Sequence, residues 1–198
     1  SAKYFMKNGK LIILSAPSGT GKTSICKELL KRNQKWKFSI SATTREKRKN
    51  EVDGIDYHFM SLKQFEHKES FGEFLEWEFV HGNRYATPID PIEEIIGSNK
   101  IMLLDIDVKG SMNIIEEFES DAISIFIEPP GFDIEERLAS LANRLKKRDG
   151  QSGTLINQRL KRYNLEMEYK EKFMYHFINE DFKNTTITIE NKIKELTK

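Results

Sequence analysis

The chain has 198 residues, which is enough for one compact domain with a sizeable apolar core. Apolar residues make up 38% of the chain and charged residues 32%, which lies within the range of globular proteins, on the polar side. The 32 basic and 31 acidic residues leave a formal charge of +1, which gives no reason to expect a nucleic-acid or membrane partner.

The first predicted elements are a strand, a glycine-rich turn and a helix. Residues 11–15 are a short apolar run that ends at the turn, which is typical of a buried strand. Residues 23–32 then show helical spacing, with Ile25 and Leu29 four residues apart. A strand, tight turn and helix in this order indicate the start of a parallel α/β sheet.

The next segment, residues 36–57, is polar, basic and loop-like. Ser61 and Gln64 after it form a capping box, which predicts a short helix to about residue 70.

A stronger helix start follows at Asp90. We expect Asp90 to cap this helix, with Pro91 at the first helical position and Glu93 completing a second capping box. Gly97 is expected to close the far end.

Strands and helices alternate through the second half of the chain. Apolar runs predict buried strands at 101–106, 123–127 and 175–178. Helical spacing predicts a helix that opens at Asp133, a further helix that carries Tyr163, and a closing helix over 182–196. We therefore expect an α/β fold with a parallel sheet core flanked by helices.

The turn after the first strand has the spacing of a Walker A loop. Its backbone N–H groups are expected to surround phosphates, with Lys22 reaching the β- and γ-phosphates and the Thr23 hydroxyl binding Mg²⁺. A chance match is disfavoured by the strand before and the helix after the turn. The predicted ATP-binding residues of this segment are Ala16, Pro17, Ser18, Gly19, Thr20, Gly21, Lys22, Thr23 and Ser24.

A Walker A loop alone does not identify the phosphoryl acceptor. GTP-binding switch proteins read guanine with an Asn-Lys-x-Asp element, and the nearest match, Asn191-Lys192-Ile193-Lys194, lacks the aspartate. We therefore discount that class.

Five further segments closely resemble guanylate kinase, the nucleoside-monophosphate kinase family that makes GDP from GMP. They match the family in order and spacing, and the resemblance covers nearly the whole chain. The segments are residues 39–48, 51–59, 74–77, 82–87 and 104–110.

The resemblance implies a GMP site. Residues that would hold the phosphate of GMP are Arg45, Arg48, Tyr57 and Tyr85, and residues that would bind or read guanine are Ser41, Glu76, Thr87, Asp107 and Gly110. Arginines can fork onto a phosphate, and a carboxylate such as Glu76 can accept both N1–H and the 2-amino group of guanine. Adenine would leave that carboxylate unpaired, a mismatch worth on the order of 10⁴ in discrimination when it is buried.

The resemblance also implies a lid of arginines over ATP, with Arg144, Arg148 and Arg159 at the matching positions. Residues 130–144 form a longer segment than in the family, so Arg137 competes with Arg144 for the first lid position. Asn179 resembles the family's adenine-side contact, and Asp105 is expected to orient water on Mg²⁺. The implied organisation is a core (about 1–38, 89–130 and 166–198), a GMP-binding lobe (about 39–88) and a lid (about 131–165).

The implied reaction transfers the γ-phosphoryl group of MgATP to GMP, and to dGMP, as a step of purine nucleotide metabolism. Lys22, Arg45 and the three lid arginines would carry catalysis. Each residue also has a structural alternative: the basic loop could be solvated, Glu76 a surface acid, and Tyr57 and Tyr85 core aromatics. Two rival functions stay open, a guanylate-kinase-like peptide-binding module and a kinase for another small molecule such as a ribose phosphate.

Cysteine usage and apolar patterning bear on location. The single cysteine, Cys26, cannot form an internal disulfide, which fits a reducing cytosol. The longest apolar stretches are far shorter than the roughly 20 residues that span a bilayer, and the N-terminus does not resemble a signal peptide. We expect a cytoplasmic protein; the sequence does not indicate its oligomeric state.

Overall fold

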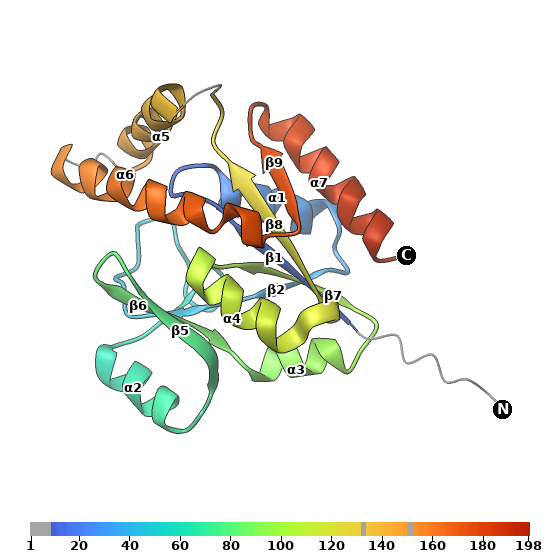
Figure 1. Cartoon of the computed structure of the whole chain (residues 1–198). Helices are drawn as coiled ribbons and strands as arrows, with labels where there is room; N and C mark the ends of the chain where they lie inside the picture. The colour runs from blue at the N-terminus through green and yellow to red at the C-terminus, as the bar shows by residue number, and fades with distance from the viewer. Residues whose placement is uncertain (1–8, 132–133, 150–152) are drawn as a thin grey trace. The chain divides into compact units, whose positions relative to one another are not determined.

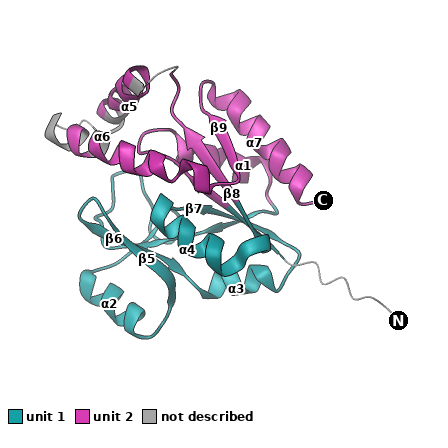
Figure 2. Ribbon diagram, in the orientation of Figure 1, with its two compact units in different colours: residues 1–12, 35–123 teal, residues 13–34, 124–198 magenta. Residues whose placement is uncertain are grey.

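The structure is a computed structural model that describes residues 9–131, 134–149 and 153–198 (Figure 1). The chain divides into two compact units (Figure 2). Unit 1 comprises residues 1–12 and 35–123, and unit 2 comprises residues 13–34 and 124–198.

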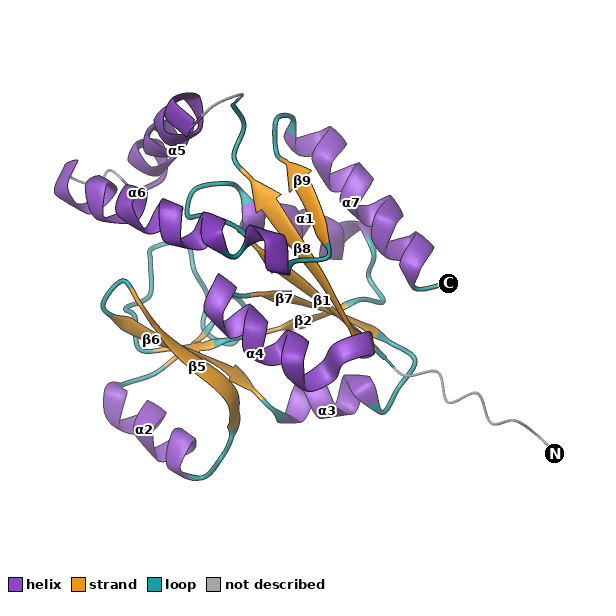
Figure 3. Cartoon of the chain, viewed as in Figure 1, coloured by secondary structure: helices purple, strands orange, loops and turns teal. Residues whose placement is uncertain are grey.

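Unit 1 contains strands of two sheets (Figure 3). In the larger sheet, β2 (Lys37–Ser39) pairs in parallel with β7 (Ile101–Asp105). The smaller sheet has the order β4-β3-β6-β5. Its strands are β3 (Ala42–Thr43), β4 (His58–Phe59), β5 (Phe74–Val80) and β6 (Asn83–Pro88).

Strands β5 and β6 form an antiparallel hairpin that the sequence analysis did not predict. The two residues of its turn, His81 and Gly82, both have positive φ, 50° and 82°. Two positive φ angles in a two-residue turn match the twist of the strands on either side. The resulting register places Glu76 directly opposite Thr87.

The helices of unit 1 are α2 (Leu62–Ser70), α3 (Asp90–Ile96), α4 (Val108–Phe118) and the short 3₁₀ helix η1 (Glu119–Asp121). The predicted capping box of Ser61 and Gln64 is present at α2. The predicted cap at Asp90 is wrong by one residue, because Ile89 is the N-cap of α3 and Asp90 is already helical. Ile89 itself has helical angles, which extend the helix backward by one residue.

Unit 2 contains two parallel strands and most of the longer helices. β8 (Ala122–Glu128) pairs with β9 (Tyr175–Ile178), and its first two residues belong to unit 1. The helices are α1 (Lys22–Arg32), α5 (Ile134–Asp149), α6 (Gly153–Glu168), the short η2 (Lys170–Lys172) and α7 (Phe182–Leu196). α1 packs against α7, and α5 packs against α6. The predicted helix start at Asp133 lies outside the described residues.

Strand β1 (Lys10–Ser15) contributes to both units, because the division falls between Ile12 and Ile13. The strand order is β2-β7-β1 in unit 1 and β1-β8-β9 in unit 2. The side chains of Leu11 to Leu14 are fully buried, as expected for a strand covered on both faces. The predicted parallel α/β fold is confirmed; its division into core, GMP-binding lobe and lid stays a prediction.

Candidate functional site

The predicted phosphate-binding loop, residues 16–24, lies in unit 2 between the end of β1 and the first turn of α1. Gly21 immediately precedes α1 and has φ 100°, a conformation that favours glycine. A Cβ on Gly21 would lie 2.8 Å from the side-chain nitrogen of Asn179, so the loop also needs a residue without a side chain here. The first turn of α1 carries no acidic residue, which leaves its positive end suited to an anion.

Two side chains of unit 2 hold this loop at the carbonyl oxygen of Thr20. Asn179 Nδ2 donates to that oxygen at 2.7 Å and Arg144 Nη1 donates to it at 2.8 Å. The Thr20 hydroxyl in turn donates to the Pro17 carbonyl at 2.6 Å. Asn179 is 3% exposed, and its Oδ1 has no hydrogen-bond partner within the described parts of the chain. The structure therefore brings Arg144 and Asn179, both predicted from the resemblance, to the loop.

The other predicted loop residues lie in a continuous segment. Ala16 and Pro17 are buried, Lys22 is half-buried, and Thr23 and Ser24 are exposed at the start of α1. This arrangement leaves the side chains of Thr23 and Ser24 open to solvent at the helix end.

The arginines of α5 and α6 have different surroundings. Arg137 donates to Glu128 at 2.8 Å and to the Gly131 carbonyl at 3.1 Å, and it also hydrogen-bonds with buried Tyr163. Arg144, by contrast, contacts the phosphate-binding loop. The side chains of Arg148 and Arg159 fall outside the described residues.

In unit 1, Arg45 is held in place by a carboxylate without a predicted role. Its Nη1 and Nη2 donate to Glu51 at 2.9 and 2.8 Å, and its Nε donates to the Tyr85 hydroxyl at 3.1 Å. Burial opposes ionisation of Glu51, but the hydrogen bonds from Arg45 outweigh this effect and hold the pKa of the carboxyl below its ordinary value. Glu51 lies in one of the segments that resemble the family, yet nothing in the sequence distinguishes it from its acidic neighbours.

Aromatic rings enclose the guanidinium of Arg45. Its central carbon lies 5.2 Å from the centre of the Tyr57 ring and 5.6 Å from that of Phe59. Tyr57 and Tyr85 meet edge to face, with ring centres 5.9 Å apart. Burial raises the pKa of the Tyr57 phenol, so Tyr57 is a neutral hydrogen-bond donor at any physiological pH. Arg48 is more open, with its side chain 44% exposed and its Nη1 3.8 Å from Glu51.

A second group of predicted residues surrounds the carboxylate of Glu76. The Thr87 hydroxyl donates to its Oε1, and burial raises the pKa of Glu76 to about 7. Its Oε2 lies against the first turn of α4, because a Cβ on Gly110 would be only 2.7 Å away. Asp107 caps the same turn by accepting from the Gly110 N–H at 2.9 Å.

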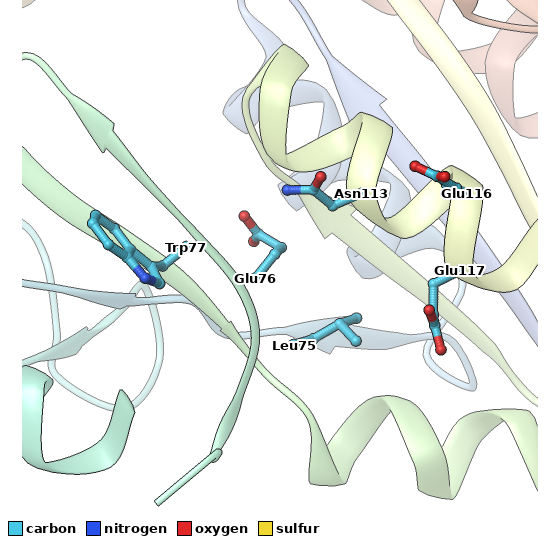
Figure 4. A pocket seen from close by; sticks show the side chains of 6 residues that line it. All are labelled: Leu75, Glu76, Trp77, Asn113, Glu116 and Glu117. Carbon is cyan, nitrogen blue, oxygen red and sulfur yellow. The ribbon is translucent and has the colours of Figure 1, made fainter. Parts of the chain in front are cut away.

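Ser41 and a cavity extend this group. Ser41 is 6% exposed and immediately precedes Ala42 of β3. Because Ala42 pairs with Ala86 of the antiparallel strand β6, Ser41 lies at the end of β3 that is next to Thr87. A cavity of about 390 Å³ adjoins Glu76, and Figure 4 shows that Asn113 of α4 points into it. The cavity is lined by Leu75, Glu76, Trp77, Asn113, Glu116 and Glu117.

Among the described residues, no group of three or more His, Cys, Asp and Glu side chains could by itself hold a metal ion. Asp105 ends β7 in unit 1 and is half-buried. Thr23 is the second residue of α1 in unit 2. Each carries an oxygen of the kind that Mg²⁺ binds, and Mg²⁺ usually takes one or two protein oxygens together with waters and phosphates. None of the described helices is long and apolar enough to cross a membrane.

Comparisons with known proteins identify related sequences. A family model described as guanylate kinase matches residues 8–196. Guanylate kinase of Chlorobaculum tepidum is 37% identical over 195 residues, which cover 98% of this chain and 97% of the relative. Guanylate kinase of Bartonella henselae is 40% identical over 189 residues, which cover 96% of this chain and 82% of the relative.

Comparison with solved structures agrees. The crystal structure of guanylate kinase from Anaplasma phagocytophilum matches with a TM-score of 0.79 and 30% identity, covering 96% of this chain and 86% of that chain. A gluconokinase from Sinorhizobium meliloti matches with a TM-score of 0.50 and 13% identity, a likeness of fold alone.

Proposed function

The chain belongs to the guanylate kinase family, and from this premise we propose that unit 2 binds MgATP and unit 1 binds GMP. The protein is an ATP:GMP phosphotransferase, which yields ADP and GDP. The observation that carries the proposal is a pair of anion-binding arrangements, one in each unit. Unit 2 offers a glycine-rich loop before a helix, and unit 1 offers Arg45 beside the phenols of Tyr57 and Tyr85. Unit 1 also holds the half-buried carboxylate of Glu76.

On the donor side, the backbone N–H groups of residues 16–24 bind the phosphates of ATP. Lys22 contributes its charge to the β- and γ-phosphates. Asn179 and Arg144 both donate to the carbonyl oxygen of Thr20 and so hold this part of the loop in place. The unsatisfied Oδ1 of Asn179 is an acceptor suited to the amino group of adenine.

Arg144 is the better candidate for the first lid arginine. Its guanidinium already lies at the phosphate-binding loop, whereas Arg137 is engaged by Glu128 and Tyr163. Arg148 and Arg159 complete the lid by resemblance. An arginine that neutralises charge on the transferred phosphoryl group can contribute roughly 10³-fold or more in rate.

On the acceptor side, Arg45, Arg48, Tyr57 and Tyr85 bind the phosphate of GMP. Glu51 holds Arg45 through two hydrogen bonds and lies 3.8 Å from Arg48, so it keeps both guanidiniums on the same side of the segment. Because the phosphate of GMP carries nearly two negative charges, guanidinium and phenol donors together match it.

Guanine is bound by Glu76, with Ser41, Thr87, Asp107 and Gly110 around it. Ionised Glu76 accepts N1–H and the 2-amino group, and Thr87 orients the carboxylate. None of these contacts involves the ribose, so we expect dGMP to be accepted as well.

Catalysis is positioning and charge neutralisation. The phosphate of GMP is already an anionic nucleophile and needs no protein base, so the protein has to align it with the γ-phosphoryl group and exclude water. Mg²⁺, when bound, offsets charge on the β- and γ-phosphates. Thr23 would hold it directly and Asp105 through water.

We also place the protein in the cytoplasm, where both substrates are made and used.

The test is an assay of phosphoryl transfer from MgATP to GMP, in which the formation of both products, ADP and GDP, is measured. Lys22→Ala should abolish the rate, whereas Lys31→Ala, on the exposed last turn of the same helix, should leave it unchanged. GMP, dGMP, AMP and ribose phosphates are compared as acceptors. If another of these acceptors were phosphorylated and GMP were not, the assignment of GMP as the acceptor would be overturned.

A further inference from the structure

Glu128 is a buried carboxylate that the mechanism above does not use. It is the last residue of β8, its side chain is 4% exposed, and it forms ion pairs with two basic residues. Arg137 Nη1 lies 2.8 Å from its Oε1, and Lys170 Nζ lies 3.0 Å from its Oε2. Replacing a buried ion pair by apolar side chains is often neutral for stability, so stability alone does not account for a charge at this place. What charged hydrogen bonds supply beyond apolar packing is a fixed direction for each partner.

The contacts of Arg137 fix the base of α5 to the end of β8. Arg137 lies in the first turn of α5, and its Nε also donates to the Gly131 carbonyl at 3.1 Å. Gly131 approaches the helix closely, because it has φ 130° and a Cβ on it would lie 2.8 Å from the backbone nitrogen of Arg137. The guanidinium of Arg137 is therefore held both by the buried carboxylate of Glu128 and by a backbone carbonyl.

The end of β8 is connected in this way to the residues that hold the phosphate-binding loop. Arg144 follows Arg137 by seven residues, which places it two helical turns farther along the same face of α5. Its Nη1 donates to the Thr20 carbonyl at 2.8 Å. The Asn179 N–H donates to the Glu128 carbonyl at 2.9 Å, and Asn179 Nδ2 donates to the same Thr20 oxygen at 2.7 Å. Both side chains that bind Thr20 are thus connected to Glu128, one through its backbone and the other through its side chain.

We propose that Glu128 is a positioning residue that holds Arg144 at the phosphate-binding loop by fixing the orientation of α5 through Arg137. The inference rests on the proposed role of Arg144 as a lid arginine. A tilt or rotation of α5 at Arg137 would carry Arg144, about 10 Å farther along the helix, away from the loop. An arginine that is placed in advance does not have to be ordered during phosphoryl transfer. Because the anchor lies at the start of α5, the rest of the helix can still close over ATP by pivoting about it.

Glu128→Gln removes the charge of the anchor and keeps the shape of the side chain. We expect kcat to fall about tenfold, because Arg144 is displaced but present, with the KM for GMP within twofold of wild type. Glu190→Gln is the matched control, because the Glu190 side chain is also 4% exposed and also bridges two basic residues of unit 2, Arg32 and Lys194, each at 2.7 Å. Both variants should have a lower melting temperature, but Glu190→Gln should keep the wild-type kcat.

Two further variants separate the direction that the anchor imposes from the stability that it contributes. Lys170→Gln removes the other partner of the same carboxylate and leaves the contact between Glu128 and Arg137 in place, so it should lower stability and keep kcat within twofold of wild type. Gly131→Ala leaves every charge in place but presses a Cβ against the backbone of Arg137, so kcat should fall as it does in Glu128→Gln. All assays are run below the melting temperature of every variant.

A double-mutant cycle with Arg144→Ala shows whether the effect passes through Arg144. In the Arg144→Ala background, Glu128→Gln should change kcat by less than twofold, because no guanidinium is left to misplace. A residue that only stabilised the fold, or an Arg137 that itself contacted the phosphates, would give the same loss of kcat in both backgrounds.

Three results overturn the proposal: a kcat of Glu128→Gln within twofold of wild type, an equal loss of kcat in Glu190→Gln, and an equal effect of Glu128→Gln with and without Arg144. If Glu128→Gln does not fold, Gly131→Ala is carried through the same measurements and judged in the same way. Failure of the proposed lid role looks different, because Arg144→Ala would then itself keep the wild-type kcat.

Discussion

The two carboxylates at the proposed GMP site differ in what already binds them. Glu51 receives both terminal nitrogens of Arg45 and stays ionised. Glu76 is half-buried with Thr87 as a donor, and its partial burial raises its pKa to about 7. Glu51 is thus satisfied without substrate and shapes the phosphate site. Glu76 has acceptor capacity left for the N–H groups of guanine.

The raised pKa of Glu76 predicts that GMP binding depends on pH. Only the ionised carboxylate accepts from both N1–H and the 2-amino group, and below about pH 7 the protonated form predominates in the free protein. The KM for GMP should therefore rise as the pH falls, approaching about tenfold per pH unit well below 7. Steady-state kinetics at saturating MgATP between pH 5.5 and 8.5 measure it.

Glu76→Gln is the control for titration of GMP itself. The variant should bind GMP weakly at every pH, and its profile should retain only the titration of the substrate phosphate. If variant and wild type showed parallel profiles, Glu76 would not be the group that titrates.

Close packing at Gly110 predicts that a substitution there raises the KM for GMP and leaves the KM for MgATP unchanged. A Cβ at this position would lie 2.7 Å from Glu76 Oε2 and 3.1 Å from Asp107 Oδ1, so Gly110→Ala must displace the carboxylate that reads guanine. We expect the KM for GMP to rise at least tenfold, with the KM for MgATP unchanged. Gly97→Ala is the matched control, since its Cβ would meet Glu93 at an ordinary 3.5 Å. Equal effects of the two substitutions would contradict the packing argument.

At the scale of elements, Arg137 and Arg144 of α5 have separate tasks. Arg137→Ala removes a partner of buried Glu128, which keeps Lys170 at 3.0 Å, so we expect a loss of about 2 kcal/mol in the free energy of unfolding. Arg144→Ala should cost little stability but lower kcat by roughly 10²-fold or more. Denaturant unfolding and kcat of both variants measure this. The reverse pattern would assign the lid role to Arg137.

Elements with strong local signals could be predicted from sequence. The apolar runs of β1, β7, β8 and β9 and the capping box of α2 depend on neighbouring residues, and the structure has them. The β5–β6 hairpin was missed because the exposed positions of β5 carry the aromatic residues Trp77 and Phe79, whereas Glu76 and Glu78 are half-buried. This is the reverse of the usual pattern, in which polar residues face solvent. α4 was not predicted, because Gly110 in its first turn weakens the helical signal that the N-cap Asp107 provides.

In the candidate site, too, residues that belong to a recognisable motif were predicted and residues outside one were missed. The Walker A spacing located the loop of unit 2, and the resemblance named Arg144 and Asn179, which the structure places against it. Glu51 carried no signal, because an acidic residue looks alike in sequence whether it is solvated or bound to an arginine as Glu51 is to Arg45.

At the scale of the whole molecule, the predicted GMP residues all fall in unit 1, and the predicted ATP-binding and lid residues all fall in unit 2. Transfer requires that the two anionic substrates meet in line. Water must also be excluded, because it would otherwise accept the phosphoryl group. Both demands are met if residues 39–88 and 131–165 move toward the core only when both substrates are bound.

Paired spin labels test this closure directly. Buried Cys26 is first replaced by serine. Cysteines for labelling are then placed in pairs at exposed positions: Lys63 in the GMP-binding segment, Lys146 in the lid segment, Lys183 on α7 and, for a control pair, Lys31 on α1. The 63–183 and 146–183 distances should shorten when GMP and a non-hydrolysable ATP analogue are added together, and less with either alone. The 31–183 pair, on α1 and α7 of unit 2, should not change, because these helices pack against each other. Distance distributions that stay the same for all three pairs would mean that the protein binds both substrates without closing, and that water is excluded by fixed structure.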